Sequence, residues 1–127
     1  MDIKQKLEGY FIDLSIPFEA KEDNVWIITD EQRGFENVLV TSDDQVVTIT
    51  VKVMNIPSSN KEKFFEKLLE LNATDMIHGA YAIEGNSIVL IDSLEGPTMD
   101  LEEIQASLDA ISLALSQHYP VLAEYRA

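Results

Sequence analysis

The residues with the strongest chemical reactivity are few and lie far apart in the sequence. The chain has two histidines, His78 and His118, and no cysteine. Histidines that share a metal on a helix stand three or four residues apart, and these two do not. The lack of cysteine excludes disulfides, thiolate metal ligands and a thiol nucleophile. We therefore expect no metal site and no cysteine-based catalysis.

The carboxylates are numerous but form no pattern that indicates catalysis or ion binding. Asp and Glu make up 23 of the 127 residues, so neighbouring pairs arise by chance. Asp43 and Asp44 are typical of a turn, and Glu102 and Glu103 after Asp100 are typical of a helix start. Neither a calcium loop nor a glycine-rich phosphate loop is present.

No nucleophile, base and orienting acid stand at spacings that would mark a catalytic triad. Ser116 lies two residues from His118, a proximity that chance readily provides. We therefore predict that the protein is not an enzyme and binds no cofactor. An enzyme would instead show a concave cluster of titratable groups around His78 or His118.

The net charge narrows the classes of partner. Nine basic residues against 23 acidic ones give a formal charge of −14. Such a surface repels phosphate backbones and anionic membranes, so we expect neither nucleic acid nor membrane as a partner. The sequence has no secretory signal at its start and no apolar run of the ~20 residues that a membrane helix needs, which predicts a soluble cytoplasmic protein. The acidity serves solubility, or it favours a neutral or basic protein partner.

The N-terminal half predicts a helix followed by a β-meander. Ile3, Leu7, Phe11 and Leu14 form one helical stripe, which predicts a helix over residues 3–15, ended by Pro17. A polar link over residues 19–24 follows. Residues rich in β-branched and aromatic types then predict strands over the ranges 25–29, 35–41 and 45–54, joined by short turns.

The C-terminal half predicts a helix, a hairpin and a long last helix. A capping box of Ser59 and Glu62 marks the start of the first of these helices. Residues 79–83 and 87–91 read as a β-hairpin. The last helix is predicted over residues 101–119, capped by Asp100 and ended by Pro120.

These elements predict a single α+β domain over residues 1–127, in the order αβββαββα. Helices packed on one face of a five-stranded antiparallel sheet would bury every apolar stripe. The strand around Trp26 is apolar on both of its faces, because Val25, Ile27 and Ile28 surround the tryptophan. Its second face is therefore covered by a folded-back loop, by a dimer partner or by a client segment.

Local strings in the C-terminal half resemble the type III secretion chaperone-like family, including its YbjN-type branch. Residues 68–72, Leu-Leu-Glu-Leu-Asn, are similar to the helix end of that family. Residues 79–90 are similar to its hairpin. The amphipathic last helix, ending at Tyr-Pro-Val-Leu over residues 119–122, completes the resemblance.

The resemblance implies a homodimer that holds a segment of a client protein. Carried over by position, the dimer interface would include Phe64, Phe65, Leu68 and Tyr81. By the same transfer, the client would contact a set of apolar residues on the first helix and the sheet: Leu7, Phe11, Trp26, Val38 and Val40.

The sequence thus leaves a leading hypothesis and an alternative. The leading hypothesis is a homodimeric, chaperone-like or regulatory protein that binds an unidentified protein client and exposes an apolar strip on its sheet. The alternative is a protein that binds a small apolar ligand, in an enclosed pocket lined by residues such as Trp26 and Tyr81.

Overall fold

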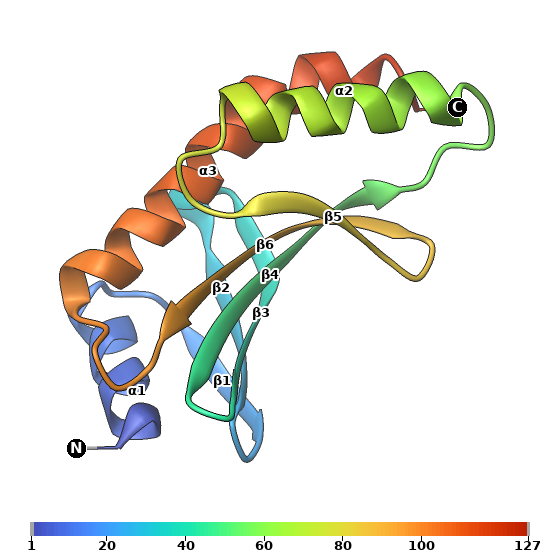
Figure 1. Ribbon diagram of the computed structural model, residues 1–127. Helices are drawn as coiled ribbons and strands as arrows, with labels where there is room; N and C mark the ends of the chain where they lie inside the picture. The colour runs from blue at the N-terminus through green and yellow to red at the C-terminus, as the bar shows by residue number, and fades with distance from the viewer. Residues whose placement is uncertain (1, 127) are drawn as a thin grey trace.

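The computed structural model describes residues 2–126, in which helices pack on one side of an antiparallel sheet (Figure 1). In chain order the elements are α1 (Ile3–Asp13), β1 (Phe18–Glu22), β2 (Val25–Asp30), the 3-10 helix η1 (Glu31–Arg33), β3 (Phe35–Asp43), β4 (Val46–Asn55), α2 (Lys61–Thr74), β5 (Ala80–Glu84), β6 (Ser87–Glu95) and α3 (Leu101–Ala123). The strands are ordered β1-β2-β3-β4-β6-β5, so α2 carries the chain past β4 to the β5–β6 hairpin. The predicted α+β class is confirmed.

The sheet has six strands where the sequence predicts five, and the additional strand is β1. Most of β1 lies in residues 19–24, which were expected to form a polar link. Phe18 pairs with Ile28, and Glu19 pairs with Ile27. After Phe18, every residue of β1 is exposed. This edge strand is held by backbone pairing, and its sequence lacks the apolar alternation on which strand prediction depends.

The predicted capping box of α2 is absent. The N-cap of α2 is Asn60, in a left-handed conformation with φ 56°, and its side chain makes no capping hydrogen bond. Ser59 therefore lies one residue outside the cap position that the sequence pattern assigned to it. By contrast Asp100 caps α3 as predicted, because its carboxylate accepts a hydrogen bond from the backbone N–H of Glu103 at 2.8 Å.

Two helix ends differ from the predicted ones. α1 ends at Asp13, because Ser15 adopts a left-handed conformation with φ 59° before Pro17 is reached. α3 runs through Pro120 to Ala123. A proline costs a helix its N–H hydrogen bond, and here that loss falls near the helix end where Ser116 and Pro120 are exposed to water.

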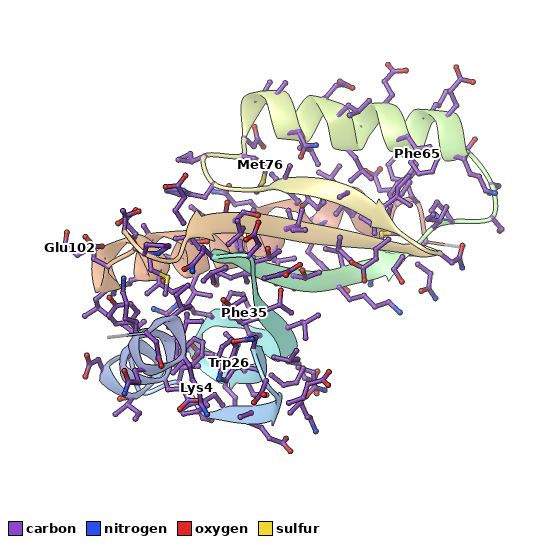
Figure 2. The ribbon with its side chains drawn as sticks, turned by 60° about the horizontal axis from the view of Figure 1, so that its bottom comes forward. Lys4, Trp26, Phe35, Phe65, Met76 and Glu102 are labelled. Carbon is purple, nitrogen blue, oxygen red and sulfur yellow. The ribbon has the colours of Figure 1, made fainter. Side chains whose placement is uncertain are left out.

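One hydrophobic core lies between the helices and the sheet. In β4, Val47, Ile49 and Val51 alternate on the core side and are buried. Val53, expected to continue this face, is half-buried, and after the register shift between Lys52 and Met54 the buried side chain is Met54. The largest fully buried side chains come from all three helices and from the sheet: Trp26, Phe11, Phe35, Phe64, Leu7, Ile28, Ile49, Ile88, Leu90, Ile104, Leu108 and Ile111. Trp26 lies beside α1 (Figure 2), where its Nε1 donates to Glu8 at 2.9 Å. No helix within residues 2–126 has the length and apolar character to cross a membrane.

Candidate protein-binding surfaces

The face of the sheet opposite the helices carries an apolar strip. Val25, Ile27, Leu39 and Ile91 are half-buried and Val89 is 4% exposed; the five alternate with core residues along β2, β3 and β6, and none of them joins the core cluster. The register places Ile27 opposite Leu39, and it places Leu39 and Ile91 on either side of the same residue of β4. We call these residues the open-face strip. Among residues 2–126, no helix lies on this face of the sheet (Figures 1 and 2).

Carboxylates stand at the margins of the open-face strip. Glu19 pairs with Ile27 across β1 and β2, and Glu22 pairs with Val25. Asp43 and Glu95, at the same end of the strands as Glu22, stand on either side of Val46. All four acidic residues are exposed. Lys21 forms an ion pair with Glu19, and Lys52 stands opposite Val89 on the same face. Within residues 2–126, the acidic groups of this rim without an ion-pair partner are therefore Glu22, Asp43 and Glu95, which attract basic groups.

A second apolar patch lies where α2 meets the edge strand β5. The exposed fractions are 68% for Leu69 on α2, 85% for Ile77 in the following loop and 57% for Ile83 on β5. Leu69 lies one helical turn before Asn72, whose side chain binds the backbone of Tyr81 in β5. We call Leu69, Ile77 and Ile83 the α2–β5 patch.

The sequence-predicted dimer residues lie on these same elements but mostly point inward. Phe64 is fully buried, Leu68 is 5% exposed and Tyr81 is 6% exposed. Phe65 is half-buried against the core. The exposed positions are their neighbours, such as Leu69. The dimer role of the four residues stays a prediction.

The sequence-predicted client-binding residues all lie in the core. None of them is more than 1% exposed: Leu7, Phe11, Trp26, Val38 and Val40. The open-face strip uses the adjacent strand positions, with Ile27 next to Trp26 and Leu39 between Val38 and Val40. Because these strands are apolar on both faces, their sequences do not tell which face the helices cover. The client role of the five buried residues stays a prediction.

His118 is a buried residue at the centre of a chain of hydrogen bonds that reaches the surface at Asp75. The ring is 3% exposed, and its Nδ1 lies 2.7 Å from the Tyr81 hydroxyl. Its Nε2 lies 2.9 Å from the carboxylate of Asp75, the C-cap residue of α2. A carboxylate beside Nε2 requires a proton on that nitrogen, so in the neutral ring Nδ1 accepts the Tyr81 proton. The partners of His118, Tyr81 and Asp75, are too distant in the chain for spacing to reveal them.

The surroundings change the pKa values of both partners of His118. Burial raises the pKa of the Tyr81 phenol, and the nearby Asp75 carboxylate raises it further. Hydrogen bonds from Thr74 and from His118 lower the pKa of the Asp75 carboxyl. The raised pKa keeps Tyr81 protonated as a hydrogen-bond donor, and the lowered pKa keeps Asp75 ionised as an acceptor. The arrangement therefore fastens α2, β5 and α3 together.

His78 stands apart from this chain of hydrogen bonds. It lines an open depression of about 560 Å³ with Asp92, Glu95, Asp100, Glu102 and Glu103, which is the kind of concave titratable cluster expected of an enzyme. Two of these carboxylates have structural partners, because Asp100 caps α3 and Asp92 accepts a hydrogen bond from Ser107. In residues 2–126, no group of three His, Asp or Glu side chains is placed to hold a metal ion.

Comparison with known families decides the affiliation of the chain. The family model described as CesT_Tir_1 matches residues 2–127. The chain belongs to the CesT_Tir_1 family. The resemblance predicted from the C-terminal strings is thereby confirmed. No curated protein sequence matches this CesT_Tir_1 protein significantly.

Solved structures share the fold of this CesT_Tir_1 protein at low sequence identity. YbjN from E. coli matches with a TM-score of 0.68 at 16% identity, covering 91% of this chain and 90% of that one. The ExoU–SpcU complex of the Pseudomonas aeruginosa type III secretion system matches with a TM-score of 0.74 at 13% identity, covering 91% and 97%. The Yersinia pestis type III secretion chaperone SycH, solved with a fragment of YscM2, matches with a TM-score of 0.67 at 12% identity, covering 91% and 98%.

The pocket that the small-ligand alternative requires is not formed by the residues predicted for it. Trp26 is 1% exposed and Tyr81 is 6% exposed, and both pack within the core. Neither side chain lines any of the main surface depressions of residues 2–126. Space that a ligand would need around them is filled by this chain's own side chains.

Proposed function

We propose that this CesT_Tir_1 protein is a non-enzymatic, homodimeric binding module that holds a segment of a partner protein. The observation that carries the proposal is the open-face strip, a row of aliphatic side chains outside the core on a sheet face without a helix. Apolar area removed from water stabilises a complex by roughly 25 cal/mol per Å². The fold likeness to SpcU and SycH, each solved in a complex with another protein, supports the proposal.

The acidic rim supports a partner segment that is neutral or basic. A segment with apolar side chains toward Ile27, Leu39 and Ile91 would place its polar side chains near Glu22 and Glu95. Lysine or arginine at those positions would gain attraction and faster association, whereas acidic residues would be repelled.

A cytoplasmic location, expected from the sequence, remains part of the proposal.

A photo-crosslinking amino acid at position 39 tests the partner-binding surface. In lysate from the native host, we expect the crosslinker at Leu39 to give one discrete adduct, and the added change Ile27→Glu to remove it. The matched control places the crosslinker at Leu113, which is 56% exposed on α3, away from the strip. Adducts of equal yield from positions 39 and 113, or an adduct at 39 that survives Ile27→Glu, would contradict the proposed surface.

The homodimer is proposed to form through the α2–β5 patch. Leu69, Ile77 and Ile83 are among the most exposed large apolar side chains, and β5 is an edge strand with one unpaired side. Apolar side chains in such a position favour burial by a second copy.

Multi-angle light scattering of the double variant Leu69→Glu/Ile83→Glu tests the dimer. We expect the wild type to be a dimer at micromolar concentration and the variant to be a monomer with unchanged circular dichroism. Leu113→Glu, at a leucine that is 56% exposed on another element, should remain a dimer. A wild-type monomer would end the dimer proposal, and a dimeric double variant would move the interface elsewhere.

A further inference from the structure

β3 separates from β4 part-way along the sheet. The pairing between them runs from Asp43 opposite Val46 to Leu39 opposite Thr50. β4 continues to Asn55, and over that stretch its strand partner within residues 2–126 is β6. Figure 1 shows β2 and β3 diverging from β4 and β6. Residues 51–55 of β4, with a register shift between Lys52 and Met54, therefore present a free edge, which is a template for pairing with another strand.

Identifiable contacts hold the start of β3 away from β4. Asn37 adopts a left-handed conformation with φ 53°, where the β2–β3 register shifts. Just before β3, the carbonyl of Arg33 accepts a hydrogen bond from Ser112 of α3 at 2.7 Å. The Arg33 guanidinium also binds Asp109 of α3 at 2.8 Å. The opening of the sheet is thus built into the fold by the bulge and by α3.

A groove follows this free edge. One depression of about 310 Å³ lies between Gly34 and Glu36 of the β3 start, the edge of β4, and the α3 side chains Leu115, Tyr119 and Leu122. A second depression of about 640 Å³ continues along residues 52–58 to Asn86. Lys52 and Arg126 line both. We call the two together the β4 groove.

The charge of the β4 groove is opposite to that of the molecule. The chain has nine basic and 23 acidic residues, yet the groove has Lys52 and Arg126 against one lining carboxylate, Glu36. The Arg126 guanidinium lies 5.1 Å from the centre of the Tyr119 ring, a cation–π contact that keeps it at the groove. These cations attract carboxylates, which the acidic rim of the open-face strip would repel.

We infer that the β4 groove binds an extended, acidic segment of a partner protein as an added β-strand. A strand placed about 4.8 Å from β4 can pair with its free backbone groups, and five residues of it would span roughly 17 Å. Alternate side chains of the segment would lie on Leu115 and Tyr119, and its carboxylates would reach Lys52 and Arg126. The inference does not depend on the open-face strip, for which a neutral or basic segment is proposed.

Peptide titration followed by backbone amide NMR tests the inference. The probe is a blocked octapeptide of alternating Val and Glu. We expect it to shift the backbone amide signals of residues 51–55 and of Gly34 in the protein. A Val–Lys octapeptide should bind at least about tenfold more weakly. A Val–Glu octapeptide with every second amide N-methylated cannot complete the strand pairing and should lose binding to the same degree.

A charge-reversal pair supplies the matched control. Lys52→Glu/Arg126→Glu should weaken binding of the Val–Glu peptide at least about tenfold. Lys4→Glu/Lys63→Glu makes the same change in net charge on exposed positions outside the groove and should change affinity less than about threefold. Equal losses in the two double variants would show general charge attraction and overturn the inference.

Three further outcomes overturn it. Undiminished binding of the N-methylated peptide would exclude strand pairing, and shifts confined to Ile27, Leu39 and Ile91 would place the peptide on the open-face strip. Absence of binding by the Val–Glu peptide at about 1 mM would also count against the groove. Failure of the crosslinking experiment at Leu39 leaves these results unaffected, so the two proposals stand or fall separately.

Discussion

The hydroxyl of Tyr81 lies 2.7 Å from Nδ1 of His118, and this hydrogen bond joins the edge strand β5 to α3 inside the protein. The other ring nitrogen of His118 lies 2.9 Å from Asp75 at the end of α2. The side chain of Asn72 completes the junction, because it accepts from the Tyr81 N–H at 2.7 Å and donates to the Tyr81 carbonyl. These bonds fix how α2 lies against β5, and with it the geometry of the proposed dimer surface.

Removing the Tyr81 hydroxyl should destabilise the protein. Tyr81→Phe leaves Nδ1 of His118 without its partner at a site that is 3% exposed. An unpaired buried polar atom costs about 1–3 kcal/mol, so we expect the free energy of unfolding in urea to fall by that amount. Tyr119→Phe makes the same chemical change at a residue that is 58% exposed, and should alter stability by less than about 0.5 kcal/mol. Similar effects of both changes would mean that the buried hydrogen bond makes no net contribution to the free energy of unfolding.

Stability should decline in alkaline solution, in part through Tyr81. Burial raises the pKa of this phenol in the folded state, whereas in the unfolded chain it titrates near about pH 10. Below about pH 10 the phenol is protonated in both states, so the contribution of Tyr81 to the free energy of unfolding does not change with pH. Above that pH the unfolded state binds fewer protons than the folded state, so the free energy of unfolding falls as pH rises. Urea titrations between about pH 8 and 11 measure this slope.

Tyr81→Phe should make that alkaline slope shallower without removing it. Tyr10 contributes in the same direction, because desolvation and the nearby carboxylates of Asp100 and Glu103 raise its pKa as well. An identical slope in wild type and Tyr81→Phe would contradict the assignment to Tyr81.

Elements with strong local signals were predictable from the sequence. The alternation of Val47, Ile49 and Val51 identifies β4, and the stripe through Leu7 and Phe11 identifies α1, because burial of one face imposes a period on the chain. The N-cap role of Asp100 follows from residue type alone. These features depend on neighbours within a few positions.

Features that depend on tertiary packing were not predictable. β1 is exposed and polar, so its pairing with β2 leaves no mark in the residue pattern. The strands around Trp26 and Leu39 are apolar on both faces, and only the placement of the helices decides which face becomes the core. Tyr81 and His118 lie on different elements far apart in the chain, so no spacing rule connects them.

The N-cap of α3 offers a direct test of a local contribution. Asp100→Ala removes the acceptor of the Glu103 N–H bond, and we expect the free energy of unfolding to fall by about 1 kcal/mol. Glu102→Ala removes a carboxylate from the same first turn and should cost only a few tenths of a kcal/mol through the helix dipole. The comparison is made by urea denaturation in the same buffer. A larger loss from Glu102→Ala than from Asp100→Ala would contradict the capping role.

Two glycine-to-alanine changes should act in opposite directions. A Cβ on Gly96 would lie 2.8 Å from the carbonyl oxygen of Gln45 and would collide with the side chain of Ile3. The loop at Gly96 also receives a hydrogen bond from Lys6 of α1 at 2.9 Å, so displacement would loosen α1. We expect Gly96→Ala to lower the free energy of unfolding by about 1–3 kcal/mol.

Gly9 makes the matched control because it lies within α1 and a Cβ there would meet nothing within 4 Å. Alanine is the better helix former, since glycine loses more backbone entropy on folding, so Gly9→Ala should raise the free energy of unfolding by about 0.5–1 kcal/mol. Fluorescence of Trp26, which is 1% exposed and bonded to Glu8 of α1, reports both transitions. A Gly96→Ala variant as stable as wild type would show that the close packing of Ile3 and Lys6 of α1 against Gly96 does not contribute to stability.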